Sequence, residues 1–276
     1  MIKLTDLQQQ TEILFDNTSY SIAEKDFGTA DIKLSTSQGY KQIGETVQGR
    51  TIGTRNISLV GYCLATTEKE MLERKRLLQT VATINKDFLI IVDDTYKLQV
   101  AATSSVAFGK SYAENNKFIC KFMIEATATF PFFQQINETT KEIYYQNNPC
   151  AVNNTSDCAV GLKIKLYWRD RVNPPKNPYI INKTTGEKIT ITYTFEMSWT
   201  DEIVINTHYG NKNAQIGYYL GTSTEEIIVS NAIPLMSSDS TFFSLEQGIN
   251  KFEIGAEENG NTLGAELTYT NCFLGV

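Results

Sequence analysis

The chain has 276 residues, of which 41% are hydrophobic, 11% aromatic and 20% charged. This composition excludes an intrinsically disordered chain and predicts a soluble globular protein, and the length suggests two domains. The formal net charge of -6 argues against binding to phosphate backbones as the main function. The longest apolar run, Phe88 to Val92, is too short to span a membrane, and residues 1–10 lack the apolar stretch of a secretory signal.

The first distinctive segment is a glycine-containing stretch from about Thr36 to Gly53. Residues 44–51 differ by one substitution, Arg50 in place of lysine, from the Gly-x4-Gly-Lys-Ser/Thr phosphate loop. A phosphate loop needs a helix directly after it, whereas the residues that follow have the composition of a strand. We therefore expect a flexible hairpin or arm here and no nucleotide site.

A helix is predicted from Thr67 to about Ala82. The Thr67 hydroxyl can accept a hydrogen bond from the amide three residues on while Glu70 reaches back, which is the pattern of a capping box. We expect one apolar stripe of this helix to face the core, made of Met71, Leu72, Leu78 and Val81.

Strands surround this helix in the first half of the chain. Ile57 to Leu64 is one strand, and residues 88–100 are expected to form a hairpin around an acidic turn at Asp93 and Asp94. From Phe118 to Phe130 every even-numbered residue is apolar or small, which predicts a long strand with that face buried.

The second half begins after a polar, asparagine-rich stretch from Tyr145 to Asp157, which contains Pro149 and predicts a linker or long surface loop. We accordingly place the two domains at residues 1–144 and 145–276. Apolar and polar residues alternate over residues 162–168 and from Ile189 to Met197, and Asn259-Gly260 is a signal for a tight hairpin. These features predict an all-β sandwich or jelly roll.

The sequence is poor in catalytic groups. Its five cysteines include Cys150 and Cys158, whose spacing matches no zinc or redox motif. The single histidine, His208, excludes any site that needs two imidazoles. Paired carboxylates such as Glu257-Glu258 are more typical of hairpin tips than of hydrolase acids. We predict no enzymatic activity, no metal site and no cofactor.

Segments along nearly the whole chain follow the order of a known family. In the first half these are an arm ending in Gly49-Arg50, then the strand, helix and hairpin above, then Ala-Thr-Ala-Thr-Phe-Pro at residues 126–131. In the second half they are Asn-Pro-Tyr-Ile-Ile-Asn at residues 177–182, Asp-Glu-Ile-Val-Ile at residues 201–205, and residues 242–252 and 267–276. In these features the chain resembles the distal tail (Dit) family of long-tailed, siphovirus-type bacteriophages that infect Gram-positive bacteria.

The resemblance implies a mainly β fold with one α-helix. Residues 1–144 would form a tail-tube-like β-sandwich with a helix, followed by a galectin-like β-sandwich or jelly roll. It also implies a structural protein of the virion, at the tail tip or baseplate, assembled in the cytoplasm of the host bacterium. Six copies would form a ring that joins the tail-tube protein to the tail-tip protein or baseplate hub and encloses a channel for DNA transit. In some members the ring supports receptor-binding proteins, and no membrane partner is expected.

Within such a ring, the arm is the candidate contact between neighbouring subunits, with the candidate residues Gly39, Tyr40, Gly44, Gly49 and Arg50. The alternative function is a carbohydrate-binding module that recognises host cell-wall saccharide, which the aromatic residues of the second half favour. Galectins bind sugar with a cluster of histidine, asparagine and arginine. Because no arginine follows His208, we transfer no lectin site.

Overall fold

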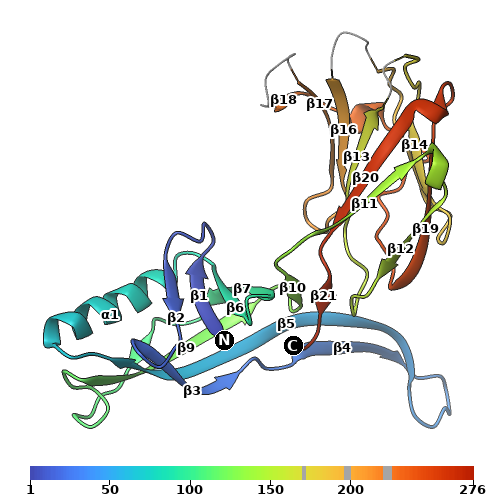
Figure 1. The fold of residues 1–276 in the computed structure, drawn as a ribbon. Helices are drawn as coiled ribbons and strands as arrows, with labels where there is room; N and C mark the ends of the chain where they lie inside the picture. Colours follow the sequence, from blue (N-terminus) through green and yellow to red (C-terminus); the bar gives the residue numbers. More distant parts are fainter. Residues whose placement is uncertain (170–171, 196–199, 220–225) are drawn as a thin grey trace. The chain divides into compact units, whose positions relative to one another are not determined.

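The computed structural model describes residues 1–169, 172–195, 200–219 and 226–276. The chain divides into two compact units, residues 1–136 with 273–276 (unit 1) and residues 137–272 (unit 2) (Figure 1). This division lies ahead of the boundary that the sequence predicts after residue 144. The described residues are mainly β and contain one α-helix, and none of their helices has the length and hydropathy to cross a membrane.

Unit 1 is built on an eleven-stranded antiparallel sheet. Its strands are β1 (Ile2–Asp6), β2 (Glu12–Leu14), β3 (Tyr20–Asp26), β4 (Ala30–Ser37), β5 (Thr46–Leu64), β6 (Phe88–Val92), β7 (Tyr96–Ala102), β8 (Ala107–Phe108), β9 (Ile119–Ala128), β10 (Phe133–Gln135) and β21 (Cys272–Phe273).

The main path of this sheet runs β2-β1-β6-β7-β9-β5-β3. β4 pairs with β5, β8 with β9, and β10 with both β7 and β21. The pairing of β7 with β9 is short and joins Ala101 to Thr127 and Ala102 to Ala126. Strands on both sides of this junction contribute side chains to one core, whose largest members include Phe88, Phe122 and Phe133.

Helix α1 (Glu68–Val81) forms where the sequence predicts it. Thr67 is the N-cap, and its hydroxyl oxygen accepts a hydrogen bond from the Glu70 N–H at 3.2 Å, as expected. The Glu70 carboxylate reaches back, as predicted, but its main partner is the residue before the cap. It accepts hydrogen bonds from the N–H and hydroxyl of Thr66, at 2.8 and 2.9 Å, and the Thr67 N–H makes a smaller contribution.

The apolar face of α1 is narrower than predicted. Met71, Leu78 and Val81 are buried, whereas Leu72 is 53% exposed. Met71, Leu78 and Val81 lie within about 80° of one another around the helix, and Leu72 lies about 100° from Met71 in the other direction, outside that face. Leu72 is therefore a surface residue.

The strand predictions for the first half are confirmed in their centres. Within β9, Cys120, Phe122, Ile124, Ala126 and Ala128 are buried. Phe118 and Phe130 lie outside the strand and are exposed, so the predicted ends are wrong because alternation in sequence continues beyond the paired backbone. Asp93 and Asp94 both have φ of 51° and form the turn between β6 and β7, as the acidic dipeptide predicts.

Residues 273–276 complete unit 1. Arg55 of β5 is buried, and its guanidinium donates a hydrogen bond to the Leu274 carbonyl. The same guanidinium lies 5.0 Å from the centre of the Phe133 ring, and burial lowers its pKa. The Phe273 ring meets the Tyr96 ring edge to face at 5.7 Å. A segment that follows unit 2 in sequence thus packs into unit 1.

Unit 2 contains two antiparallel sheets that face one another (Figure 1). One is six-stranded, in the order β11 (Thr139–Tyr144), β20 (Leu263–Tyr269), β13 (Lys163–Trp168), β16 (Thr200–Asn206), β17 (Asn213–Tyr219) and β18 (Glu226–Asn231). The other is four-stranded, in the order β12 (Cys150–Asn154), β19 (Gly248–Gly255), β14 (Tyr179–Asn182) and β15 (Lys188–Thr190). Buried side chains such as Leu166 and Phe252 alternate with exposed ones along these strands, which makes the unit the predicted β-sandwich.

Three local predictions for the second half are wrong. The expected linker from Tyr145 to Asp157 contains strand β12, because Cys150, Val152 and Asn154 alternate inward and pair with β19. Asn259 and Gly260 form no tight hairpin, since a short 3₁₀ helix, η3 (Gly260–Thr262), joins β19 in one sheet to β20 in the other. The strand expected from Ile189 ends at Thr190, and Met197 lies outside the described residues.

Candidate interaction site: the arm formed by β4 and β5

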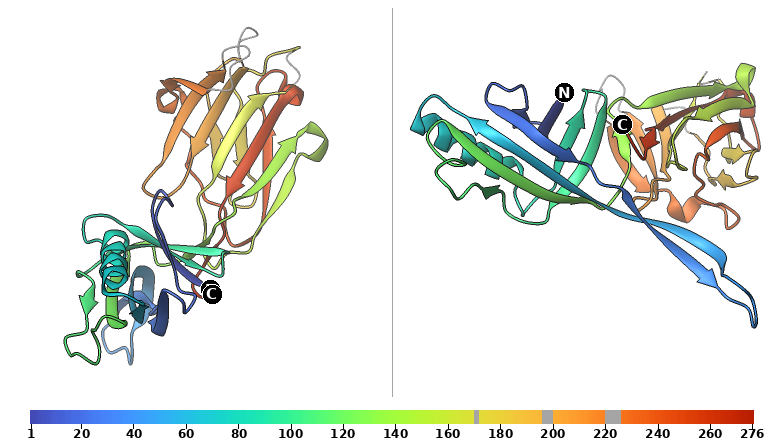
Figure 2. Two further views of the ribbon diagram at one scale, coloured as in Figure 1. Left: turned by 60° about the vertical axis from the view of Figure 1, so that its left-hand side comes forward. Right: turned by 90° about the horizontal axis from the view of Figure 1, so that it is seen from below.

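The sequence-predicted site residues lie on one long hairpin, which we call the arm and define as residues 30–54. It consists of β4, the loop after it and the first half of β5, and it runs out beyond the rest of unit 1 (Figure 2). The sequence places the arm at Thr36 to Gly53, so its first strand was missed. Ile32 and Leu34 alternate with polar neighbours there, which was the available signal.

The root of the arm is fixed by backbone geometry. Gly28, in the turn between β3 and β4, has φ of 56°, and a Cβ there would collide with the Asn56 carbonyl. β3 and β4 therefore follow one another along the same edge of β5. Arg55, opposite Ala30, is the first buried residue of β5. The residues of β5 before Arg55, which belong to the arm, are exposed or half-buried.

The tip of the arm is organised by Gln42, a residue that the sequence analysis missed. The Gly39 N–H donates to Gln42 Oε1 at 2.8 Å, and the Gln42 N–H donates to the Gly39 carbonyl at 3.0 Å. Gln42 Nε2 also donates to Thr46 Oγ1 at 2.9 Å. Gly44 has φ of 82°, which suits glycine. These contacts leave Tyr40, which is 93% exposed, pointing into solvent.

The two faces of the arm differ in character. In the register of β4 and β5, Ile32 lies opposite Ile52 and Leu34 lies opposite Arg50, so these four side chains share one face. Ile32, Leu34 and Ile52 are 58%, 54% and 41% exposed. We call them, with Arg50, the apolar arm face.

The opposite face of the arm carries Lys33 and Thr51 as one pair and Ser35 and Gly49 as the next. Gly49 lacks a side chain, so this face is polar and shallow. The arm is thus an amphipathic two-stranded ribbon with no core behind it. Isolated two-stranded ribbons are marginally stable in water, and an exposed apolar face of this kind favours contact with a partner. Of the predicted site residues, Arg50 thus lies on the apolar arm face, Gly49 on the opposite face, and Gly39, Tyr40 and Gly44 in the loop at the tip.

A second surface feature of unit 1 is a shallow polar hollow of about 410 Å³ on β3, β5 and β9. Its lining includes the carboxylates Asp26 and Glu125 together with Asn56, Ser58 and Thr127. The Thr127 hydroxyl donates to Asn56 Oδ1 at 2.9 Å. No group of three or more histidine, cysteine or carboxylate side chains could hold a metal ion in the part of the chain that the structure describes.

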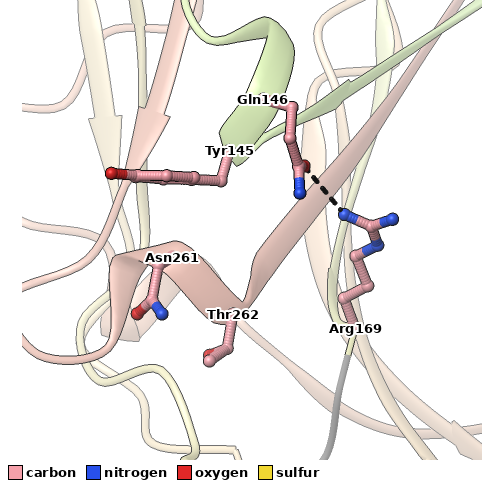
Figure 3. Close-up of a pocket in the computed structure, with 5 residues that line it drawn as sticks. All are labelled: Tyr145, Gln146, Arg169, Asn261 and Thr262. Atoms are coloured by element: carbon pink, nitrogen blue, oxygen red, sulfur yellow. Dashed lines mark hydrogen bonds between the residues drawn. The ribbon is translucent and has the colours of Figure 1, made fainter.

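Unit 2 has a hollow of about 650 Å³ lined by Tyr145, Gln146, Arg169, Asn261 and Thr262 (Figure 3). Arg169 donates a hydrogen bond to Gln146 Oε1 at 3.2 Å and lies 4.7 Å from the centre of the Tyr144 ring, which fixes the guanidinium. The exposed Tyr145 ring and the Asn261 amide face the other part of the hollow (Figure 3). This combination of a ring, a cation and amides suits a hydroxyl-rich ligand.

His208 does not belong to that hollow. Its Nδ1 lies 2.6 Å from Asn206 Oδ1, its backbone N–H donates to the same oxygen at 2.9 Å, and burial lowers its pKa. Gly161 packs against it, since a Cβ at that position would collide with the His208 backbone. The arrangement is that of a structural histidine.

No protein-family model matches the chain, and no curated protein sequence is significantly similar to it. Among solved structures, the chain is similar to the Dit protein (gp 19.1) of phage SPP1, described as a paradigm of the hub adsorption apparatus in phages that infect Gram-positive bacteria. The TM-score is 0.72 at 11% identity, covering 99% of each chain. Structures of the phage P2 baseplate, activated with calcium or strontium, give TM-scores of 0.50 and 0.51 at 13% and 12% identity, covering 98% of this chain and 97% of those chains. The chain therefore has the fold of a phage distal tail protein.

Proposed function

We propose that this protein is a structural distal tail protein, six copies of which form a ring between the tail tube and the tail-tip or baseplate hub of a phage. The observation that carries the proposal is the extent of the fold similarity, which covers 99% of this chain and includes both units. The protein would act in the virion after assembly in the host cytoplasm.

In this proposal the arm is the contact between neighbouring subunits. A ring uses heterologous contacts, in which one surface of each subunit meets a different surface of the next. The described residues leave the apolar arm face exposed, and burying Ile32, Leu34 and Ile52 against a neighbour would remove them from water. Arg50 beside them provides a cation for a protein whose formal net charge is -6.

The ring would enclose a channel for DNA in transit, with the tail-tube protein and the tail-tip protein as its stacking partners and receptor-binding proteins as further candidates. The polar hollow of unit 1 fits a channel lining because Asp26 and Glu125 repel phosphates. A surface that repels phosphates lets DNA pass and does not retain it.

The test is negative-stain imaging of the purified protein at micromolar concentration, with the mass of the particles measured in parallel. Six-fold rings with a central hole are the expected result. Particles that remain monomeric both alone and with the tail-tube and tail-tip proteins would overturn the proposal.

The hollow of unit 2 favours a second candidate function, binding of host cell-wall saccharide. The exposed Tyr145 ring could stack on a sugar face while Arg169 and Asn261 donate hydrogen bonds to hydroxyls. A glycan array with the full chain tests this, with Tyr145→Ala as the site variant and Tyr209→Ala, another exposed tyrosine of unit 2, as the control. Equal signals from both variants, or no signal from host polysaccharide, would reject this function.

A further inference from the structure

Two cysteines that are distant in sequence, Cys158 and Cys272, meet in unit 2. All five cysteines of the chain are free thiols. The Asp157 N–H donates a hydrogen bond to the Cys272 carbonyl at 2.9 Å, and the Cys272 N–H donates to Ser156 Oγ at 2.9 Å. The Cys272 side chain lies within hydrogen-bonding reach of the Cys158 thiol, and its Sγ also donates to the Thr270 carbonyl at 3.5 Å. Backbone and side-chain contacts therefore hold the two residues together.

The loop that carries Cys158 is itself held in place. Asn154, which is buried, donates through Nδ2 to the Cys158 carbonyl at 3.0 Å, and its Oδ1 accepts from the Ser156 N–H at 2.9 Å. A disulfide needs Cα atoms about 4.4 to 6.8 Å apart. The hydrogen bond from the Asp157 N–H to the Cys272 carbonyl, next to Cys158 in sequence, holds the two cysteines near one another, as a disulfide requires.

The two thiols differ in a way that suits oxidation. Cys158 is half-buried, whereas Cys272 is buried. The hydrogen bond from Cys272 lowers the pKa of Cys158, which raises its thiolate fraction. An accessible thiolate with a second thiol in contact is the arrangement of an oxidisable pair.

We propose that Cys158 and Cys272 form a disulfide when the protein meets hydrogen peroxide. The Cys158 thiolate attacks one peroxide oxygen, the O–O bond breaks, and the departing oxygen takes up a proton and leaves as water, so that Cys158 becomes a sulfenic acid. The Cys272 sulfur then attacks the sulfenic sulfur, the S–O bond breaks, and the oxygen leaves as water with the thiol proton. Two thiols are oxidised and one peroxide is reduced to two waters.

The consequence is a cross-link across unit 2. It would tie residue 158 to residue 272, the last residue of that unit, and so close a loop that contains most of it. Disulfides that close long loops restrict the unfolded chain most strongly. The cross-link would not form in a reducing cytoplasm but would form after release into an oxidising medium. The inference does not rest on the ring.

A second pair of cysteines provides an internal control. Cys63 and Cys120 lie directly opposite one another on β5 and β9, and both are fully buried. Burial raises the pKa of Cys63 to about 12 and also raises that of Cys120. Proximity without an accessible thiolate should leave this pair reduced.

The test is disulfide mapping of the full chain after treatment with one equivalent of hydrogen peroxide and alkylation of the remaining thiols. Trypsin leaves Cys150 and Cys158 in one peptide, residues 142–163, so the Cys150→Ser variant is used. The expected product joins peptide 142–163 to peptide 252–276, while the peptides with Cys63 and Cys120 are fully alkylated. If the Cys150→Ser variant fails to fold, the unsubstituted chain is digested with a protease that cleaves before aspartate. Cleavage before Asp157 then places Cys150 and Cys158 in different peptides.

The expected second readout is a rise of roughly 10 °C in the melting temperature of unit 2 on oxidation, lost in both Cys158→Ser and Cys272→Ser. A cross-link between Cys63 and Cys120, or a Cys158 sulfinic acid beside an alkylated Cys272, would overturn the proposal.

Discussion

The apolar arm face gives the sharpest prediction, for the triple variant Ile32→Ala, Leu34→Ala and Ile52→Ala. Full burial of such a side chain is worth about 1.5 to 3 kcal/mol. About half of each is still exposed in the single chain, so docking on a neighbour should gain about 1 kcal/mol per side chain and about 3 kcal/mol per contact. The variant loses these ~3 kcal/mol, so its affinity at each subunit contact should be about 100-fold weaker.

The assay is the mass distribution of the protein against concentration, by mass photometry or analytical ultracentrifugation, at two salt concentrations. The variant should need a much higher concentration to form rings, while its melting temperature and circular dichroism stay unchanged because the arm is outside the core. The matched control is Lys33→Ala, Ser35→Ala and Thr51→Ala, on the opposite face of the same strands. Rings of unchanged stability in the triple variant, or equal losses in the control, would refute the assignment of the interface to the apolar arm face.

Four other outcomes are expected. Deleting residues 38–49 should give folded chains without rings, and intact rings would contradict a role for the arm. Leu78→Ala should cost about 2 to 5 kcal/mol in urea unfolding, whereas Leu72→Ala on the same helix should change stability by less than about 0.5 kcal/mol. Hydrogen bonds from Thr66 lower the pKa of Glu70, so the ionised carboxylate stabilises the fold above the ordinary pKa of 4.5, and this stabilisation is lost as the pH falls through the lowered pKa. The Glu70→Gln variant should lack this pH-dependent part of the unfolding free energy. Acid unfolding profiles that are the same in both proteins would contradict this role of Glu70. Removing residues 273–276 should lower the free energy of unfolding by at least about 1 to 3 kcal/mol, because the Arg55 guanidinium loses its acceptor. The Arg55→Met substitution should restore part of this free energy in the shortened chain but not in the full chain.

The sequence predicted those elements whose pattern is set by burial. α1, the β6 and β7 hairpin and the centre of β9 have a buried face, and the period of their apolar residues reports it. The first strand of the arm was missed for the opposite reason. All of Asp31 to Ser37 is exposed, and the only sequence signal for β4 is the short alternation of Ile32 and Leu34 with polar residues.

Other errors arise where polar side chains are buried. β12 was taken for a linker because Asn154 and the neighbouring Ser156 are polar, yet both are buried and bonded to backbone or side-chain groups across unit 2. Cys158 and Cys272 are 114 residues apart in sequence, and their proximity rests on hydrogen bonds between distant segments that no local pattern reports. Gln42 was missed because its role at the tip of the arm depends on the conformation of one loop.

The return of residues 273–276 to unit 1 sets an order of events during synthesis. Residues 1–136 leave the ribosome first but lack the Leu274 carbonyl and the Phe273 ring until all of unit 2 has been translated. Unit 2 is a contiguous segment and can fold before residues 273–276 reach unit 1. Arg55, at the root of the arm, therefore gains its acceptor only in a chain whose second unit has been made. Nascent chains that stop early would carry an incompletely anchored arm, which would bias assembly towards full-length subunits.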